Sequence, residues 1–142
     1  MKLKLFILLL ALVILFFTLR PCEASMYSLI NSRRKTANLP ALTINSKLEK
    51  SAKTKACDIR DKKYWSHVDP QGRSAWYLFL KYGYEYLQAG ENLARDFKND
   101  KEAMLALMAS PTHKANILDP EFQDVGVGYC GAIIVQHYGL QR

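Results

Sequence analysis

The sequence contains little cysteine, and its cysteines lie far apart. The chain has three cysteines in 142 residues, and no two of them stand in a CxxC spacing. Cysteines at that spacing are typical of structural zinc sites, so the sequence carries no cysteine-based signature of such a site. Internal repeats are absent as well. The 49% content of hydrophobic residues is ordinary for a globular protein and argues against disorder. One folded domain is the expected organisation.

A long apolar run occurs once, at the N-terminus. It covers residues 5–17, follows a basic start, and is shorter than the roughly 20 residues of a membrane-spanning helix. Residues 1–24 therefore indicate a signal peptide or, if they are not cleaved, a membrane anchor. A lipoprotein is not expected, because Arg20 and Pro21 stand where small residues should precede a lipidated Cys22.

Acidic residues are outnumbered, with 13 Asp and Glu against 20 Lys and Arg, and the excess of positive charge lies mostly in residues 25–63. A basic surface would suit an anionic cell wall or membrane, although a solvated helix face explains the same pattern. Nucleic acid is not an expected partner. The chain is exported, and aromatic residues adjoin these lysines directly only in the segment KYWSH.

Cys57 and Cys130 remain as an even pair if Cys22 leaves with the leader. Two cysteines in an exported chain can form a disulfide. They can equally be free thiols in the core, because unpaired cysteine is among the most buried residue types. The sequence leaves both possibilities open.

Hydrophobic periodicity predicts an α+β domain with helices first and strands last. We expect helices over residues 26–38, 46–62, 74–82 and 100–109, and a hairpin over 122–139. A further strand is possible within residues 87–94.

Two helix starts carry specific expectations. The helix 46–62 opens with a capping box between Ser46 and Glu49, and it places Leu48, Ala52, Ala56 and Ile59 on one face. Asp100 is the expected N-cap of the helix that follows it.

Three polar residues stand out against this scaffold, namely His67, Glu91 and His113, each expected on a loop or at a helix edge. Two imidazoles and a carboxylate can hold a divalent transition metal or carry out acid and base chemistry. From spacing alone the signal is weak, and two hydrogen-bonded loop histidines with a buried helix-capping glutamate are the preferred explanation.

The ordered motifs LPAL, SHVDPQG, GENLA, SPTHKANIL, VGVGY and VQHYG resemble the SCP domain of the CAP superfamily, which comprises cysteine-rich secretory proteins, antigen 5 and pathogenesis-related 1. The resemblance is strongest to the compact bacterial branch and assigns residues 25–142 to one such domain. It implies an α-β-α sandwich around a small antiparallel sheet with a central cavity. It also implies that His67 and His113 can hold Zn²⁺ or another divalent cation beside Glu91, and that Pro111 ends a helix so that His113 faces His67.

The chain departs from the family pattern at two positions. The second acidic residue of the family's cavity is replaced by Ser110, and a usual tryptophan is replaced by Leu107. Ser110 is not expected to be a nucleophile, because no oxyanion donor can be named for it. His137 alternates with Val135 along its strand, so we expect it to be packed in the core instead of binding metal.

Two classes of function fit these residues. The first is a non-enzymatic extracellular module that binds a lipid, a wall component or a protein. The second is a metal-dependent hydrolase in which Glu91 polarises a water on an ion held by His67 and His113. The missing carboxylate favours the binding module.

Overall fold

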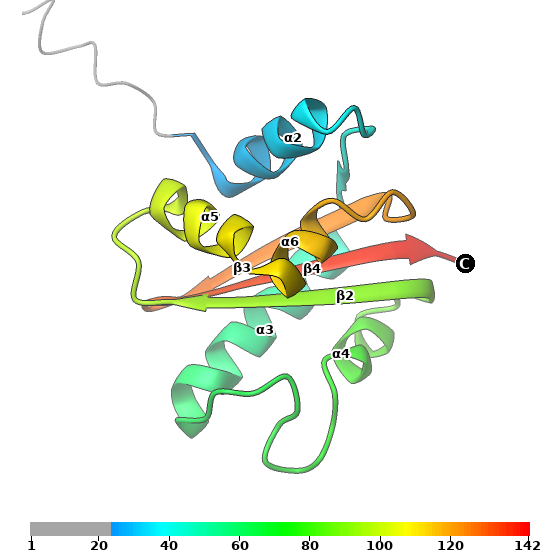
Figure 1. The fold of residues 1–142 in the computed structure, drawn as a ribbon. Helices are drawn as coiled ribbons and strands as arrows, with labels where there is room; N and C mark the ends of the chain where they lie inside the picture. The colour runs from blue at the N-terminus through cyan, green and yellow to red at the C-terminus, as the bar shows by residue number, and fades with distance from the viewer. Residues whose placement is uncertain (1–23) are drawn as a thin grey trace, which may run out of the picture.

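The computed structural model describes residues 24–142, which form a sheet covered by helices on both faces (Figure 1). The predicted leader spans residues 1–24, of which residues 1–23 lie outside the described part of the chain. Within residues 24–142, no helix is both long enough and apolar enough to cross a membrane.

The helices predicted from periodicity are present, with one addition. They are α2 (Met26–Thr36), α3 (Ser46–Lys62), α4 (Trp76–Lys81), α5 (Asp100–Ala109) and α6 (Pro111–Ile117). The addition is α6, which forms from a segment expected to be irregular.

The sheet has four strands in the order β1-β3-β4-β2. They are β1 (Thr43–Ile44), β2 (Tyr86–Arg95), β3 (Asp124–Cys130) and β4 (Ile133–Gln141). The predicted hairpin is β3 and β4, and the possible strand within 87–94 is β2. Neither β1 nor its parallel pairing with β3 was predicted, because two residues give no readable periodicity.

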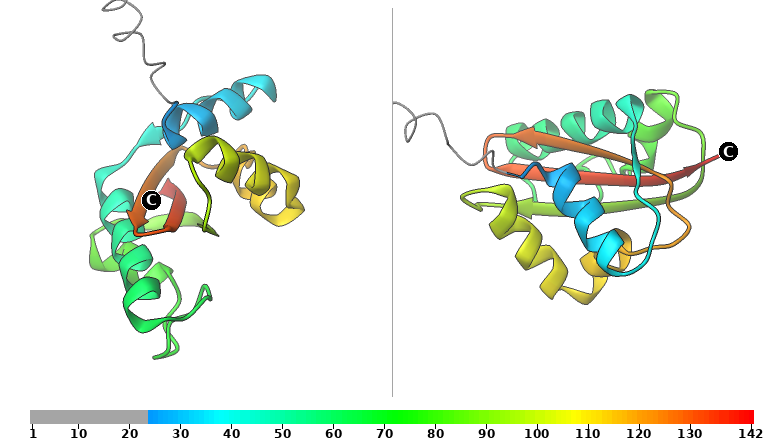
Figure 2. Two further views of the ribbon diagram at one scale, coloured as in Figure 1. Left: turned by 90° about the vertical axis from the view of Figure 1, so that its left-hand side faces the viewer. Right: turned by 90° about the horizontal axis from the view of Figure 1, so that it is seen from above.

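The layers confirm the expected α-β-α sandwich (Figure 2). Helix α3 crosses one face, and its buried Leu48, Ala52, Ala56 and Ile59 confirm the predicted apolar side. Helices α2, α5 and α6 cover the other face, over a larger cluster that includes Met104.

Two glycines of β3 allow α3 to lie directly on the sheet. A Cβ atom on Gly126 would come within 2.2 Å of the backbone of Leu48 and Glu49, and one on Gly128 within 2.1 Å of the backbone of Lys53. No side chain fits in either place, so any substitution there must push α3 away from the sheet.

A disulfide joins Cys57 of α3 to Cys130 at the end of β3, with 5.0 Å between the Cα atoms. It fastens the C-terminal half of α3 to the sheet. Of the two possibilities that the sequence left open, the structure has the bridge.

The N-caps of α3 and α5 were predicted one residue too late, at Ser46 and Asp100. The N-cap of α3 is Asn45, whose side chain accepts from the Lys47 amide, so Ser46 is already helical. The N-cap of α5 is Asn99, which accepts from the Glu102 amide. An asparagine accepts this bond as well as serine or aspartate does, so residue type alone could not decide between neighbours.

Pro111 begins a helix instead of ending one. Ser110 has extended backbone angles and separates α5 from α6, with Pro111 as the first residue of α6. A residue before proline avoids the helical region, and proline is favoured at the first helical position, so both effects place the break at Ser110. Helix α5 does end just before Pro111, but Pro111 itself opens α6, and His113 lies in the first turn of that helix.

Arg34 is the largest fully buried side chain, and its guanidinium group pairs with backbone carbonyls. It donates to the carbonyls of Pro40, Ile117, Asp119 and Phe122 at 2.7 to 3.3 Å. Burial lowers the pKa of Arg34, although the guanidinium stays charged. This one side chain ties the end of α2 to the segment between α6 and β3.

We expect Arg34→Met to lower the free energy of unfolding by about 3 kcal/mol or more, because several buried carbonyls lose a charged donor. Urea unfolding followed by circular dichroism measures the change. The matched control is Lys35→Met on the exposed side of the same helix, which should change stability by less than about 0.5 kcal/mol. Equal effects of the two substitutions would contradict the assigned role.

Candidate functional site

Glu91 lies in the middle of β2, not on a loop or at a helix edge as the sequence suggested. It stands directly opposite His137 of β4 in the antiparallel register. Directly opposed residues project their side chains to the same face of a sheet, so strand pairing alone brings this carboxylate and imidazole together. The face is the one covered by α3 and α4.

Both carboxylate oxygens of Glu91 are engaged by imidazole rings. Oε1 lies 2.6 Å from Nδ1 of His67, and Oε2 lies 2.8 Å from Nε2 of His137. The Glu91 side chain is 2% exposed. The second nitrogen of His137, Nδ1, lies 2.8 Å from the hydroxyl of Ser51 on α3. Four residues from four segments thus form one chain of hydrogen bonds.

The charge distribution in this chain follows from burial and hydrogen bonding. Burial opposes the ionisation of Glu91, but the hydrogen bonds with His137 and His67 outweigh it and hold the pKa of Glu91 below its usual value. Complete burial lowers the pKa of His137, and the carboxylate offsets only part of that effect. Glu91 is therefore ionised at neutral pH, and His137 is neutral.

His67 differs from His137 in its exposure. Its side chain is 60% exposed, and the hydrogen bond to Glu91 raises its pKa, with partial burial acting in the opposite direction. When the ring is neutral, Nδ1 carries the proton that is donated to Glu91. The lone pair is then on Nε2, which is the arrangement that a carboxylate imposes on metal-binding histidines.

His113 lies on α6 and is half-buried. Burial lowers the pKa of His113, and the charge of His67 adds to the effect, so the two rings are electrostatic neighbours. The carbonyl of His113 accepts from the side chain of Asn92 on β2, which ties α6 to the strand. Ser110 sits at the junction of α5 and α6, where its hydroxyl lies 3.2 Å from that of Thr112.

A groove of about 390 Å³ opens beside this cluster along β2, which is an edge strand. Its lining includes His67, Trp76, Ala89, Glu91 and Asn116. The side chain of Asn116 donates to the backbone carbonyl of Glu91, so α6 contacts the open edge of the strand at this point. The groove combines apolar walls with imidazole, amide and backbone groups.

The donor set limits what metal this site can hold. Among residues 24–142, no group of three or more His, Cys, Asp or Glu side chains is arranged to bind an ion. Glu91 is committed to two imidazoles, which leaves His67 and His113. Two imidazoles fit a loosely held ion whose other positions are open, and they do not fit a closed structural zinc site, which takes four protein ligands.

Sequence reasoning missed two members of the cluster. His137 is fully buried and packs 4.7 Å from the ring of Phe79, in line with the expectation of a packed residue, but its contact with Glu91 was not foreseen. Ser51 was not considered at all. The signal for His137 was its position opposite Glu91, which becomes visible only when the strand register is known.

Acid should weaken the fold through this cluster. The lowered pKa of His137 means that the unfolded chain takes up a proton below about pH 6.5 that the folded chain resists, and the lowered pKa of Glu91 adds to the loss in more acidic solution. The raised pKa of His67 acts in the opposite direction, since the stability it contributes is complete at low pH and is lost as pH rises through its folded pKa.

We therefore expect the free energy of unfolding to fall as pH drops below about 6.5. His137→Gln should flatten this decline, by about 1.4 kcal/mol in total per unit of pKa shift removed. His67→Gln should instead remove the part of the stability that is lost as pH rises above about 6.5. Urea unfolding at a series of pH values measures the slopes. An unchanged slope in His137→Gln would show that this ring does not resist protonation.

Comparisons with known proteins agree with this architecture. The family model described as the cysteine-rich secretory protein family, CAP, matches residues 27–136. The protein YkwD of Bacillus subtilis (strain 168) is 37% identical over 118 residues, which is 82% of this chain. The chain spans only 46% of the length of YkwD.

Solved structures show the same fold. An extracellular protein of Bacillus anthracis containing an SCP domain is 25% identical, with a TM-score of 0.79 over 82% of this chain and 39% of that protein. An outer surface protein of Borrelia burgdorferi is also 25% identical, with a TM-score of 0.75 over 82% of this chain and 90% of that protein. The chain carries a bacterial SCP domain and belongs to the CAP family of cysteine-rich secretory proteins.

Proposed function

We propose that this protein is an extracellular binding module whose ligand occupies the groove beside His67 and Glu91, with a divalent cation held weakly by His67 and His113. The predicted leader and the names of the two structural neighbours, an extracellular protein and an outer surface protein, support a secreted or envelope-associated location. If the leader is not cleaved, the domain is anchored at the membrane.

The observation that carries this proposal is the complete engagement of Glu91. A general base must reach a water that is placed to attack a substrate. Glu91 instead uses both oxygens on imidazole rings and has almost no exposed surface. It orients His67 and is poorly placed to activate water, and Ser110 supplies no second carboxylate. The arrangement thus favours binding over the alternative of metal-dependent hydrolysis.

The groove favours a polar ligand over an acyl chain. An acyl chain is held best in an enclosed apolar cavity, whereas this groove is open and presents Ser74, Asn116 and the free edge of β2. A protein segment or a wall polymer can use such hydrogen-bonding groups, and apolar parts of either can contact Trp76 and Val68. Of the three ligand classes, a lipid fits this groove least well.

We expect weak binding of Zn²⁺ by the exported protein and at least about a tenfold loss of affinity in the His67→Ala, His113→Ala double variant. Glu91→Gln should weaken binding by about 10- to 100-fold, because it removes the group that orients His67. Affinity should fall as pH decreases toward and below about 6.5, since imidazole binds metal only when neutral. The raised pKa of His67 should start this loss at a higher pH than an ordinary histidine would.

Isothermal titration calorimetry at two pH values tests this expectation. The matched control is Lys114→Ala, which changes the exposed residue next to His113. It should bind Zn²⁺ as the wild type does. Heats that persist unchanged in the double histidine variant would place the ion elsewhere. A protease or esterase activity that is lost in folded Glu91→Gln would overturn the preference for a binding module.

A further inference from the structure

Lys55 occupies an unusual position for a lysine. It lies on α3 with 2% of its surface exposed, and lysine is rarely buried to this extent unless it is paired with a carboxylate. Within the described part of the chain, no carboxylate oxygen lies within ion-pair distance of its ammonium group. Burial lowers the pKa of Lys55, and the charges of Glu91, Asp58 and Asp69 act on it from farther away. A buried charge without a direct ion pair is costly, so its contacts call for an explanation.

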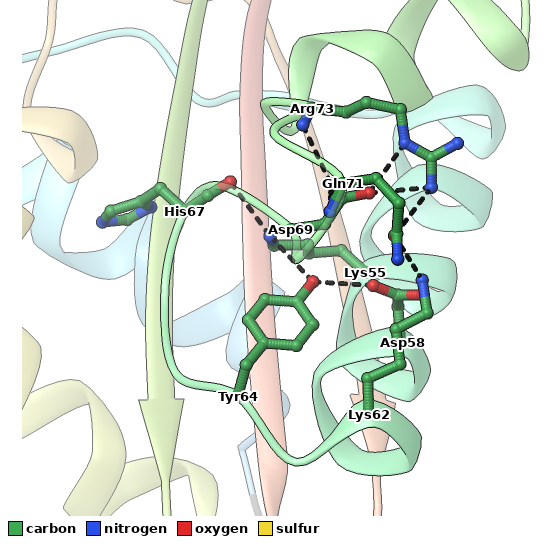
Figure 3. Close-up of polar contacts among 8 residues, drawn as sticks. All are labelled: Lys55, Asp58, Lys62, Tyr64, His67, Asp69, Gln71 and Arg73. Carbon is green, nitrogen blue, oxygen red and sulfur yellow. Dashed lines mark hydrogen bonds and ion pairs between the residues drawn. The ribbon is translucent and has the colours of Figure 1, made fainter.

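The ammonium group makes two hydrogen bonds. Nζ donates to the backbone carbonyl of His67 at 2.9 Å and to the hydroxyl of Tyr64 at 3.1 Å (Figure 3). It also lies 4.9 Å from the centre of the Tyr64 ring, a cation–π distance. The Tyr64 hydroxyl in turn donates to Asp58 of α3 at 2.8 Å. Lys55 is therefore connected to the loop that follows α3 at both Tyr64 and His67.

The rest of that loop is held mainly to itself. Asp69 accepts from the amides of Gln71 and Arg73 and pairs with the Arg73 guanidinium, which closes the tip of the loop. The tip reaches α3 through Lys62, which donates to Gln71 at 3.0 Å in an exposed position. The contact of Lys55 with the His67 carbonyl is partly buried and lies at the proposed site residue itself.

The position of the His67 ring depends on its backbone. The ring is mostly exposed, and among residues 24–142 its one hydrogen bond is the bond to Glu91. A single hydrogen bond cannot fix a ring whose backbone is free to move, because the loop would lose conformational entropy each time the bond formed. A charged donor on the carbonyl of the same residue removes that freedom.

We propose that Lys55 is a positioning residue, whose buried ammonium group holds the carbonyl of His67 and thereby fixes the imidazole ring on Glu91. This inference deepens the proposed function and rests on His67 being the group that meets the ion or ligand. Its primary test uses the protein without metal, so a failure to bind Zn²⁺ would remove the proposed function and leave the role of Lys55 to be judged separately.

The test is the tautomer of His67 in Lys55→Met, read from the imidazole ¹⁵N chemical shifts at a pH at which the ring is neutral. The wild type should show one tautomer, with the proton on Nδ1. Lys55→Met should show both tautomers in exchange, and the hydrogen-bonded amides of Tyr64 and Val68 should exchange with solvent about tenfold faster or more. A general loss of stability would not mix the tautomers in protein that is still folded.

Two further variants make the result specific. Lys55→Arg should restore the single tautomer, because the cavity of about 100 Å³ beside Lys55 gives room for the longer side chain, which keeps its charge and donors. Lys62→Met removes the exposed tether at the loop tip together with the ion pair between Lys62 and Asp58, and it should leave His67 as in the wild type. If Lys55→Met fails to fold, Tyr64→Phe removes one partner of Lys55 and should give the same change to a smaller degree.

The proposal is overturned if His67 keeps one tautomer and the wild-type exchange rates in Lys55→Met. It is also overturned if Lys62→Met disturbs His67 as strongly as Lys55→Met does, since the loop would then be held generally and not by Lys55. If Tyr64→Phe leaves both the His67 tautomer and the amide exchange rates as in the wild type, the proposal for Lys55 is contradicted in the same way.

Discussion

The buried carboxylate of Glu91 is the constraint on which the site depends. An ionised carboxylate loses several kcal/mol of hydration when it is taken out of water, so it is tolerated only where donors replace the lost water. His137 and His67 supply those donors from two other segments. Strand pairing fixes His137, and hydrogen bonds from α3 hold the loop of His67, so the carboxylate can be buried only when the sheet, α3 and the loop are assembled together.

Helix α3 connects this site to the rest of the molecule. Its apolar face lies on the sheet at two glycines of β3, and the disulfide fastens its C-terminal half to the end of that strand. Once the helix is held at this distance, the polar residues Ser51 and Lys55 reach His137 and the carbonyl of His67. The same close packing that stabilises the core therefore also sets the positions of the groups beneath the groove. Movement of α3 by the width of one methyl group would disturb both the packing of the core and the positions of Ser51 and Lys55.

Helix patterns were readable from the sequence because they depend on near neighbours. The apolar face of α3 and the hairpin of β3 and β4 follow from periodicities of 3.6 and 2 residues. The cap residues were misplaced by one position, since Asn45 and Ser46 are both good caps and the choice depends on how the chain enters the helix. Strand β1 has no pattern of its own and forms only because β3 offers a parallel partner.

The sequence by itself determined the family and the layers of the fold, and it predicted His67, Glu91 and His113 as residues of the site. These rest on local periodicity and on short motifs that are complete within a few residues. Only the tertiary structure decided that Glu91 is fully engaged, that His137 and Ser51 extend its hydrogen bonds, and that Lys55 lies behind His67. Those contacts join residues from 12 to 86 positions apart. No local rule relates such residues, because their meeting is set by strand register and by the distance between α3 and the sheet.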